Sequence, residues 1–273
     1  MNFNSQLAFQ PLAYQQEEQA NRLKALLEYL EMNSPYYKRR FQEEKIKISK
    51  VSTLQDLPAF FTTSKDDIQQ YNWDFLCTGR AQIREFTATS GTLGKPVTIA
   101  LTAGDLDRLA YNEQQSFLCA GAKPEDVFQL MLTLDRQFMA GMAYYAGLGN
   151  IGAAVVRTGP GLPSMQWETI QRLKVNSIVA VPSFMPKFID YAKENGIHLK
   201  DTPVTKAICI GENLREQNFE LNALGRKIKE EWDIDLYSTY ASTEMQTAYT
   251  ECRHGNGGHE QPDLIITEIL DDD

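Results

Sequence analysis

The stretch of this sequence that offers chemistry most clearly is TATSGTLGKPVTIALT, residues 87–102. It gathers hydroxyl side chains and glycines around Lys95. Glycines let the backbone approach a ligand closely, and successive N–H and O–H groups can converge on one phosphate. The composition fits a phosphate-binding loop, and it fits equally a Gly/Thr-rich hairpin tip that binds nothing.

The spacing within this stretch excludes two common nucleotide-binding loops. A P-loop has four residues between its glycines and a Ser or Thr after its lysine. Here Gly91 and Gly94 are separated by two residues, and Pro96 follows Lys95. The G-x-G-x-x-G pattern is not matched either. Pro96 disfavours a helix at Lys95, and both flanks have the composition of strands. We therefore expect a strand–loop–strand hairpin.

The elements that must position this loop are predicted by the pattern of the whole chain. Residues 1–85 form a helical, amphipathic N-terminal segment, and residues 86–273 form an α/β nucleotide-binding region. In the second region short apolar runs alternate with helical patterns, which predicts a mostly parallel sheet covered by helices. Strands are expected within 126–133, 152–159, 177–182, 206–211, 235–242 and the apolar part of 257–273, and helices within 102–121, 163–176, 183–196 and 215–233.

Capping residues place several helix boundaries. Ser64 precedes a run with Asp66 and Asp67 in its first turn, which is typical of a helix N-terminus. Thr102 is expected to begin the helix that follows the hairpin, and Gly121 to end it.

Composition and charge restrict the class of function. The 273 residues are 42% hydrophobic and 23% charged, with a formal net charge of −9. The acidic balance argues against nucleic acid as a partner, because phosphate backbones need clustered Lys and Arg. No run of eighteen apolar residues or signal peptide is seen, so we expect no membrane partner. The four cysteines show no disulfide spacing, which favours a cytoplasmic location.

Three segments in order resemble the signature motifs of the adenylate-forming superfamily, which contains the acyl-CoA synthetases. TSGTLGKP at residues 89–96 resembles its Ser/Thr/Gly loop, and CIGENLRE at 209–216 resembles the segment that borders adenine. YSTYASTEMQ at 237–246 resembles the motif that ends in a glutamate, with Ala241 where the superfamily usually has Gly. VPSFMPKFID at 181–190 is similar to the phenylacetate–CoA ligase-like branch. The resemblance covers essentially the whole chain.

This resemblance implies ATP-dependent activation of a carboxylic acid. The carboxylate attacks the α-phosphorus of ATP to give an acyl-adenylate and pyrophosphate, and the thiol of coenzyme A then displaces AMP. The branch implies an aryl or arylacetic acid such as phenylacetate. Two other readings stay open: an adenylate-forming enzyme with an acceptor other than coenzyme A, and a non-catalytic nucleotide-binding module. A homodimer is common in the branch.

The resemblance assigns roles around the nucleotide. The residues that would cradle the β- and γ-phosphates are Thr89, Ser90, Gly91, Thr92 and Gly94. Lys95 would supply a neighbouring positive charge, Thr243 would bond the α-phosphate, and Glu244 would bind Mg²⁺. The residues that would line the adenine side are Gly211, Glu212, Asn213, Tyr240 and Ala241. Three plain alternatives stand beside these roles: a solvated Lys95, a Glu212 that caps the following helix, and a Tyr240 in the core.

The acid pocket is assigned by the same resemblance. Its residues would be Phe138, Gly141, Tyr144 and Pro182. Glycine and alanine near these positions would let a flat aromatic acid lie against a helix. Apolar residues at helical spacing are more often plain core, so that alternative stands beside the pocket.

A second metal hypothesis comes from Cys252, His254 and His259, which lie close together in a Gly-rich stretch. Zinc takes Cys and His ligands in tetrahedral sites, so these three residues are candidate structural ligands. The alternative is a solvated loop with incidental histidines.

The superfamily normally continues well beyond residue 273. The chain is therefore expected to be truncated before the ribose-binding aspartate and the small mobile C-terminal domain, whose lysine contacts the reacting carboxylate. If the chain acts alone, this leads us to expect weak or no ligase activity, with some affinity for ATP or AMP retained.

Overall fold

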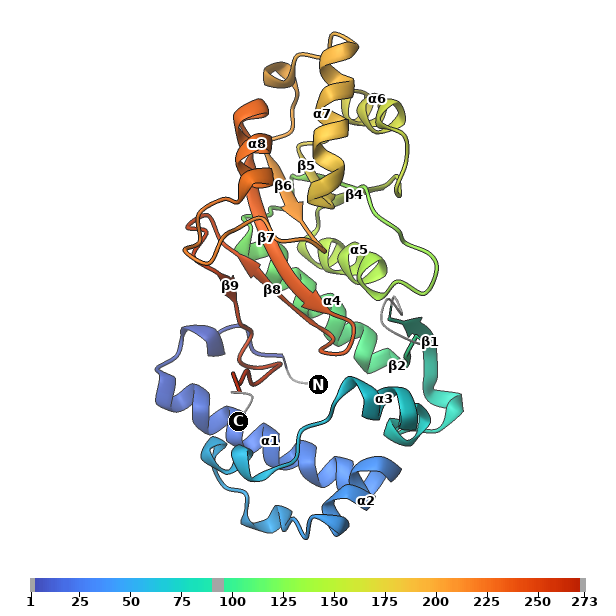
Figure 1. Cartoon of the computed structure of the whole chain (residues 1–273), viewed down its shortest axis with the longest axis vertical. Coiled ribbons are helices and arrows are strands. Elements are labelled where there is room, and N and C mark those ends of the chain that lie inside the picture. The colour runs from blue at the N-terminus through green and yellow to red at the C-terminus, as the bar shows by residue number, and fades with distance from the viewer. Residues whose placement is uncertain (1–2, 90–95, 271–273) are drawn as a thin grey trace. The chain divides into compact units, whose positions relative to one another are not determined.

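The computed structural model describes residues 3–89 and 96–270 of the chain (Figure 1). The chain divides into two units. The first comprises Met1–Leu106 together with Gln261–Asp273, and the second comprises Asp107–Glu260. The α/β class and the helical N-terminal segment predicted from the sequence are confirmed.

The first unit is mainly helical. Its α-helices are α1 (Leu12–Asn33), α2 (Pro35–Glu43) and α3 (Lys65–Tyr71). Short 3₁₀ helices lie at Leu7–Phe9, Ile48–Lys50, Leu54–Ala59, Asn72–Phe75 and Arg80–Gln82. Leu23 and Leu27 of α1 pack with Phe41, Ile48 and Val51 in a buried cluster, which agrees with the amphipathic spacing of α1.

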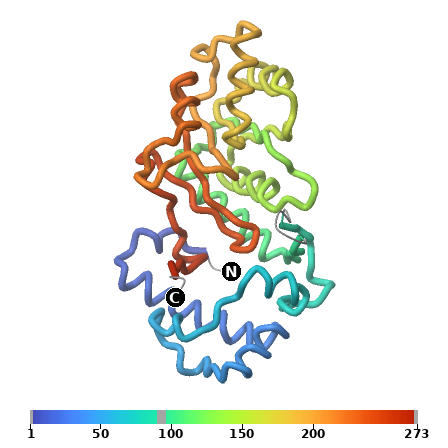
Figure 2. Tube along the Cα trace, in the orientation of Figure 1, coloured from blue at the N-terminus to red at the C-terminus, as the bar shows by residue number. Residues whose placement is uncertain are grey.

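The last described residues return to this helical unit. Their trace runs beside α1 (Figure 2). Gln19 Nε2 donates to the Ile265 carbonyl at 3.1 Å, and Arg22 Nη1 donates to the Asp263 carbonyl at 3.1 Å. Ile266 packs against the same apolar cluster. A strand predicted in the apolar part of 257–273 is therefore wrong beyond the short strand β9 (Gly258–His259), because the helix supplies partners that a neighbouring strand would otherwise provide.

The hairpin predicted around the Gly-rich stretch is confirmed on both of its flanks. Strands β1 (Ile83–Ala88) and β2 (Thr98–Thr102) pair antiparallel. Thr89 extends the pairing: its N–H donates to the Val97 carbonyl at 3.0 Å, and its Oγ1 accepts from the Val97 N–H at 3.0 Å. Thr89 is thus a buried part of the hairpin frame.

Among the described residues, the second unit contains a seven-stranded sheet in the order β4-β3-β5-β6-β7-β8-β9. Five strands run parallel: β3 (Val127–Leu130), β4 (Ala154–Arg157), β5 (Ser177–Ala180), β6 (Lys206–Cys209) and β7 (Asp235–Ser242). β8 (Thr247–Glu251) and β9 pair antiparallel. The sheet is therefore mostly parallel, as the alternating pattern predicts.

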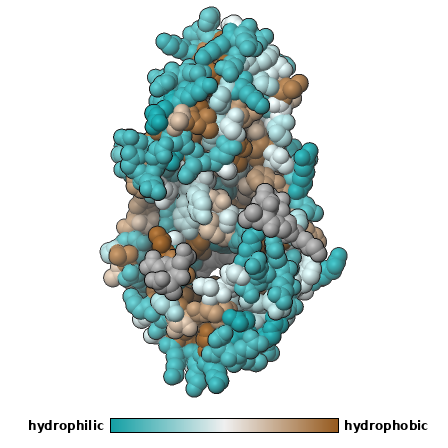
Figure 3. All heavy atoms as spheres, in the orientation of Figure 1, coloured by the Kyte–Doolittle hydropathy of each residue, from teal (hydrophilic) through white to brown (hydrophobic). Residues whose placement is uncertain are grey.

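Helices cover both faces of this sheet (Figure 1). They are α4 (Ala103–Cys119), α5 (Met139–Ile151), α6 (Pro163–Leu173), α7 (Met185–Glu194) and α8 (Ala223–Glu231), with 3₁₀ turns at Pro182–Phe184 and Leu199–Asp201. Neighbouring residues of β5 point to opposite faces: Ile178 joins the cluster with Trp167 and Phe188, whereas Val179 joins the cluster with Tyr144. The outer surface over α7 and α8 is mostly hydrophilic in Figure 3, as expected for helices with one buried face.

The local signals for helix ends are confirmed. Ser64 Oγ accepts from the Asp67 N–H at 3.1 Å, and Thr102 Oγ1 accepts from the Asp105 N–H at 3.3 Å. Gly121 has a φ of 71°, which suits a glycine after a helix.

One helix predicted from the sequence is present but begins later than expected. The expected helix at 215–233 is confined to α8, because Asn222 accepts from the Gly225 N–H at 2.9 Å and caps the helix there. Residues before it form a tight loop in which Arg215 pairs with Leu221 as an isolated bridge. Phe219 adopts a φ of 66° in this loop.

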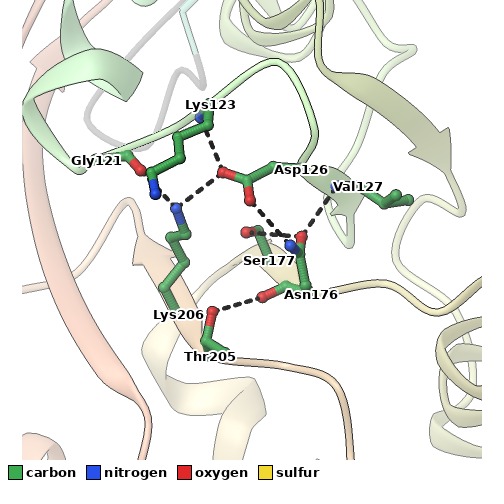
Figure 4. Close-up of polar contacts among 8 residues, drawn as sticks. All are labelled: Gly121, Lys123, Asp126, Val127, Asn176, Ser177, Thr205 and Lys206. Atoms are coloured by element: carbon green, nitrogen blue, oxygen red, sulfur yellow. Dashed lines mark hydrogen bonds and ion pairs between the residues drawn. The ribbon is translucent and has the colours of Figure 1, made fainter.

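A polar network joins the amino ends of three parallel strands (Figure 4). Lys206 Nζ lies 2.9 Å from Asp126 Oδ2 and donates to the Gly121 carbonyl at 2.7 Å. Asn176 Nδ2 donates to Asp126 Oδ1 at 2.9 Å, and Asn176 Oδ1 accepts from the Val127 N–H at 2.9 Å. These contacts fix β3, β5 and β6 at the edge opposite their carboxyl ends.

Candidate functional site at the carboxyl edge of the sheet

Three of the predicted site segments follow directly from neighbouring parallel strands. Ala180 of β5 is level with Cys209 of β6, which is level with Ser238 of β7. Pro182, Gly211 and Tyr240 therefore belong to the same edge of the sheet. In open α/β sheets, ligands bind outside the carboxyl ends of the strands.

Glu212 joins the ends of two of these strands. Its Oε2 accepts from the Ser183 N–H at 2.8 Å, and its Oε1 accepts from Ser183 Oγ at 2.7 Å. The carboxylate thus caps the turn that follows β5. The alternative that Glu212 caps the following helix is wrong, because Asn222 caps α8.

The backbone at Gly211 and Asn213 is shaped for a close approach. Gly211 has a φ of 75°, a conformation that favours glycine, and a Cβ added there would meet nothing within 4 Å. The Asn213 carbonyl accepts from Asn222 Nδ2 at 2.7 Å, while its side chain is exposed. The bond from Asn222 therefore fixes the backbone of this short segment, while the Asn213 side chain is open to solvent.

An ion pair behind this segment was not assigned a role from the sequence. Arg215 Nε lies 2.6 Å from Glu251 Oε2, and Arg215 Nη2 lies 2.9 Å from Glu251 Oε1. Glu251 also accepts from the Ser238 N–H at 2.7 Å, and its side chain is only 1% exposed. A bidentate Arg–carboxylate pair fixes geometry strongly. It ties the chain after β6 to β7 and β8.

The turn between β7 and β8 carries Thr243 and Glu244, both half-buried. Ser242 Oγ accepts from the Met245 N–H at 3.1 Å inside the turn. Arg108 of α4 donates to the Gln246 carbonyl at 2.6 Å and fixes its far end. The two predicted catalytic residues therefore lie in a turn that is held by hydrogen bonds from both sides.

Tyr240 and Ala241 are exposed near the end of β7. Tyr240 is 69% exposed, and its ring packs on Tyr249 of β8 with 6.2 Å between centroids. The alternative that Tyr240 belongs to the core is wrong. Ala241 pairs with Ala248 and keeps this strand edge free of a large side chain.

Three of the predicted acid-pocket residues lie at or in α5, and the fourth follows β5. Phe138 occupies the N-cap position of α5, and Pro182 is buried in the turn after β5. A Cβ at Gly141 would lie 2.5 Å from the Thr133 carbonyl, so close packing alone explains this glycine. Tyr144 is 3% exposed and lies in the apolar cluster with Phe117, as in the core alternative.

The candidate metal ligands do not come together. Among the described residues, we find no group of three His, Cys, Asp or Glu side chains that could hold a metal ion. This includes Cys252, His254 and His259, which lie after β8 and in β9. The zinc hypothesis therefore gains no support from the structure. Glu244 supplies a hard oxygen donor of the kind that Mg²⁺ prefers.

The phosphate-binding prediction falls mostly outside the described residues. This concerns Ser90, Gly91, Thr92, Gly94 and Lys95. Thr89 is described, belongs to the first unit and is bonded to Val97. Within residues 3–89 and 96–270, no helix has the length and apolar character to cross a membrane.

Comparison with known proteins places this geometry in a family. The family model described as "AMP-binding enzyme" matches residues 51–264. The phenylacetate-coenzyme A ligase of Thermus thermophilus is 25% identical over 259 residues, which are 93% of this chain and 57% of the relative. The Escherichia coli phenylacetate-coenzyme A ligase is 28% identical over 173 residues, which are 63% of this chain and 39% of the relative.

A solved structure has the same fold. An open conformation of 2-hydroxyisobutyryl-CoA ligase, in complex with 2-HIB-AMP and CoA, superposes with a TM-score of 0.81 at 19% identity. The match covers 92% of this chain and 60% of that chain. The chain spans about half the length of the curated relatives it matches. Since the family model covers most of the sequence, the chain belongs to the AMP-binding enzymes of the adenylate-forming acyl-CoA ligase superfamily.

Proposed function

We propose that this chain supplies the nucleotide- and acid-binding part of an AMP-forming acid–CoA ligase. The reaction joins a carboxylate oxygen to the α-phosphorus of ATP with release of pyrophosphate. The sulfur of coenzyme A then attacks the acyl carbonyl, and AMP leaves. The observation that carries the proposal is the match of the family model to residues 51–264, which include all three motif segments.

The segments at the ends of β6 and β7 support a division of labour. The Gly211–Asn213 backbone and the exposed ring of Tyr240 suit contact with a flat base. Thr243 and Glu244 lie in the adjoining turn, where a hydroxyl and a carboxylate suit the phosphate side of a nucleotide. We propose these as the nucleotide-binding residues.

Magnesium fits this arrangement, and zinc does not. Mg²⁺ is usually held by one or two carboxylates together with the phosphates of its substrate, so Glu244 suffices as a protein ligand. When bound, the metal would neutralise charge on the phosphates. Zinc in a structural site needs four closely placed ligands, a grouping absent from the part of the chain that the structure describes.

The acid is proposed to be an aryl or arylacetic acid. Support comes from the printed names of the relatives and from the half-buried ring of Phe138 at the start of α5. Coenzyme A is proposed as the acceptor, and a cytoplasmic homodimer as the form of the protein, both on the strength of the family resemblance.

Pyrophosphate release from ATP·Mg²⁺, measured on the longest available gene product across a panel of aryl, arylacetic and aliphatic acids, tests this function. Release with phenylacetate but not with aliphatic acids is expected. Glu244→Gln should lower kcat/KM by about 100-fold, since electrostatic contacts to developing charge are of this size. Thr247→Ser, in the neighbouring strand, is the matched control. An absence of release with every acid would sink the proposal.

A further inference from the structure

Three polar residues lie buried on one face of α4. Asn112 is 0% exposed, Glu113 is 5% exposed and Ser116 is 4% exposed. Ser116 lies four residues after Asn112 and three after Glu113, so its side chain neighbours both of theirs on the helix surface. We call this set the α4 polar patch. Polar side chains at such depth normally find hydrogen-bond partners.

The α4 polar patch lacks several of those partners. Asn112 Oδ1 accepts from the Ala248 N–H at 2.8 Å, which fixes the amide, but Asn112 Nδ2 is buried without a partner. Ser116 Oγ is likewise buried and unpaired. The Glu113 carboxyl is buried beside them, and desolvation dominates its environment. Asn112 Nδ2 and Ser116 Oγ thus have unused hydrogen-bonding capacity.

Glu113 packs against helix α5, whereas Asn112 bonds the backbone of β8. A Cβ added at Gly147 would lie 2.6 Å from Glu113 Cβ, so the two helices touch at this turn. Tyr144 lies one turn earlier on α5, and burial, with a smaller contribution from Glu113, raises its pKa well above the usual value. The patch therefore adjoins the helix to which the acid-binding role is proposed.

Glu113 is neutral in this setting. Burial raises the pKa of its carboxyl to about 8, with no positive side chain in the patch to offset it. A neutral carboxyl donates through its O–H and accepts through its C=O. Together with the Asn112 N–H donor and the Ser116 hydroxyl, it matches a neutral group that both donates and accepts. A second carboxylate would be an unpaired charge in the interior.

We propose that the α4 polar patch binds a hydroxyl carried by the carboxylic acid substrate, so that a hydroxylated acid is preferred over its unsubstituted counterpart. This inference rests on the proposed function and names the substrate class of the same site. Glu113 is the central specificity residue, flanked by Asn112 and Ser116.

The expected preference is large because the patch is costly when empty. A buried polar group without a partner is destabilising, and a site that hydrogen-bonds a substrate hydroxyl rejects the analogue that lacks it. We expect at least one isomer among 2-, 3- and 4-hydroxyphenylacetate to exceed phenylacetate by about 10-fold or more in kcat/KM for pyrophosphate release. Calorimetric affinity of the same acids should show the same order.

Variants separate this role from simple packing. Glu113→Gln keeps a neutral donor and acceptor and should keep the preference, whereas Glu113→Leu should remove it. Ser116→Ala is a milder second variant that should reduce the preference, in case the leucine disturbs folding. Glu230→Leu, at an exposed position of α8, is the matched control and should leave the preference unchanged.

Two results overturn the inference and leave the proposed function standing. One is equal use of phenylacetate and all three hydroxylated isomers by the unaltered chain. The other is a preference that survives in both Glu113→Leu and Ser116→Ala, since the hydroxyl is then bound elsewhere. Failure of every acid to bind or to release pyrophosphate overturns both the proposed function and the inference.

Discussion

Glu212 holds Ser183 by two hydrogen bonds, one from the Ser183 N–H at 2.8 Å and one from Ser183 Oγ at 2.7 Å. The two residues come from the ends of adjacent parallel strands, 29 positions apart in the chain. Their contact joins the segment after β5 to the segment after β6 at the carboxyl edge of the sheet.

Loss of this contact should loosen the edge without unfolding the sheet. Glu212→Ala removes both acceptors and should raise KM for ATP several-fold, with a loss of about 1 kcal/mol in unfolding free energy, as for other helix caps. Steady-state kinetics and urea unfolding measure the two effects. Glu216→Ala is the control in the same loop. An unchanged KM in Glu212→Ala would show that the edge keeps its geometry without the cap.

The Arg215–Glu251 pair should dominate the stability of the second unit. Arg215→Met leaves the Glu251 carboxylate buried and should lower the unfolding free energy by about 3–5 kcal/mol, since breaking one half of a buried pair strands the other charge. Arg215→Met with Glu251→Gln should recover part of the loss. Urea unfolding followed by tryptophan fluorescence measures both. Equal stability of the single and double variants would argue against a stranded charge.

The raised pKa of Glu113 makes stability depend on pH in a defined direction. The carboxyl titrates near 4.5 when unfolded and at about 8 when folded, so between these values only the folded state holds the proton. Stability should therefore be highest below pH 4.5 and fall by a few kcal/mol as pH rises to 8. Tyr144, which faces Glu113 from α5, stays neutral throughout this range because its own pKa is raised.

Glu113→Gln should abolish this contribution. The free energy of unfolding is measured in urea at pH 5.5, 7 and 8.5. The value for the unaltered chain minus the value for the variant should decrease steadily as pH rises, because only the unaltered chain loses stability. A difference that is constant across the three pH values would contradict a protonated Glu113.

The network at the amino ends of the strands should respond to acid in the opposite direction. Burial pushes the pKa of Asp126 upward, but the hydrogen bonds and charge of Lys206, with the Lys123 N–H and Asn176, hold it below the usual value. Its stabilisation is present above pH 3.8 and lost as pH falls through the lower folded value. Lys206→Met should cost about 3 kcal/mol at pH 7, because both charges are largely buried.

Asp126→Asn provides the comparison for that network. It should destabilise the chain at pH 7 and flatten the loss of stability between pH 4 and pH 2 in acid unfolding followed by circular dichroism. Lys229→Met is the control, since its ion pair with Asp233 is exposed. An acid transition that is identical in Asp126→Asn and the unaltered chain would show that Asp126 does not contribute to the loss of stability in acid.

Local signals in the sequence predicted much of the fold. Ser64 and Thr102 begin helices because their hydroxyls reach backbone N–H groups only three residues away. The strand pattern around residues 87–102 predicted the hairpin, because its pairing is also local. Alternation of apolar runs predicted the parallel sheet.

The features that could not be predicted from the sequence depend on contacts between residues far apart in the chain. The segment after Arg215 has helical composition, yet Arg215 bonds Glu251, 36 residues away, and the loop follows that bond. The burial of Glu113 could not be predicted from the sequence, because it depends on packing against Gly147 of another helix. Lys206 and Asp126 lie 80 residues apart, so their pairing appears only once the strands are adjacent.

The return of the last segment to α1 has a consequence for synthesis of the chain. Gln19 is bonded to Ile265, 246 residues further along, and Ile266 completes the cluster around Leu23. Residues 107–260 are therefore translated in full before the first unit has all of its parts. The apolar face of α1 therefore completes its packing only after Ile266, more than 230 residues further along, has been translated.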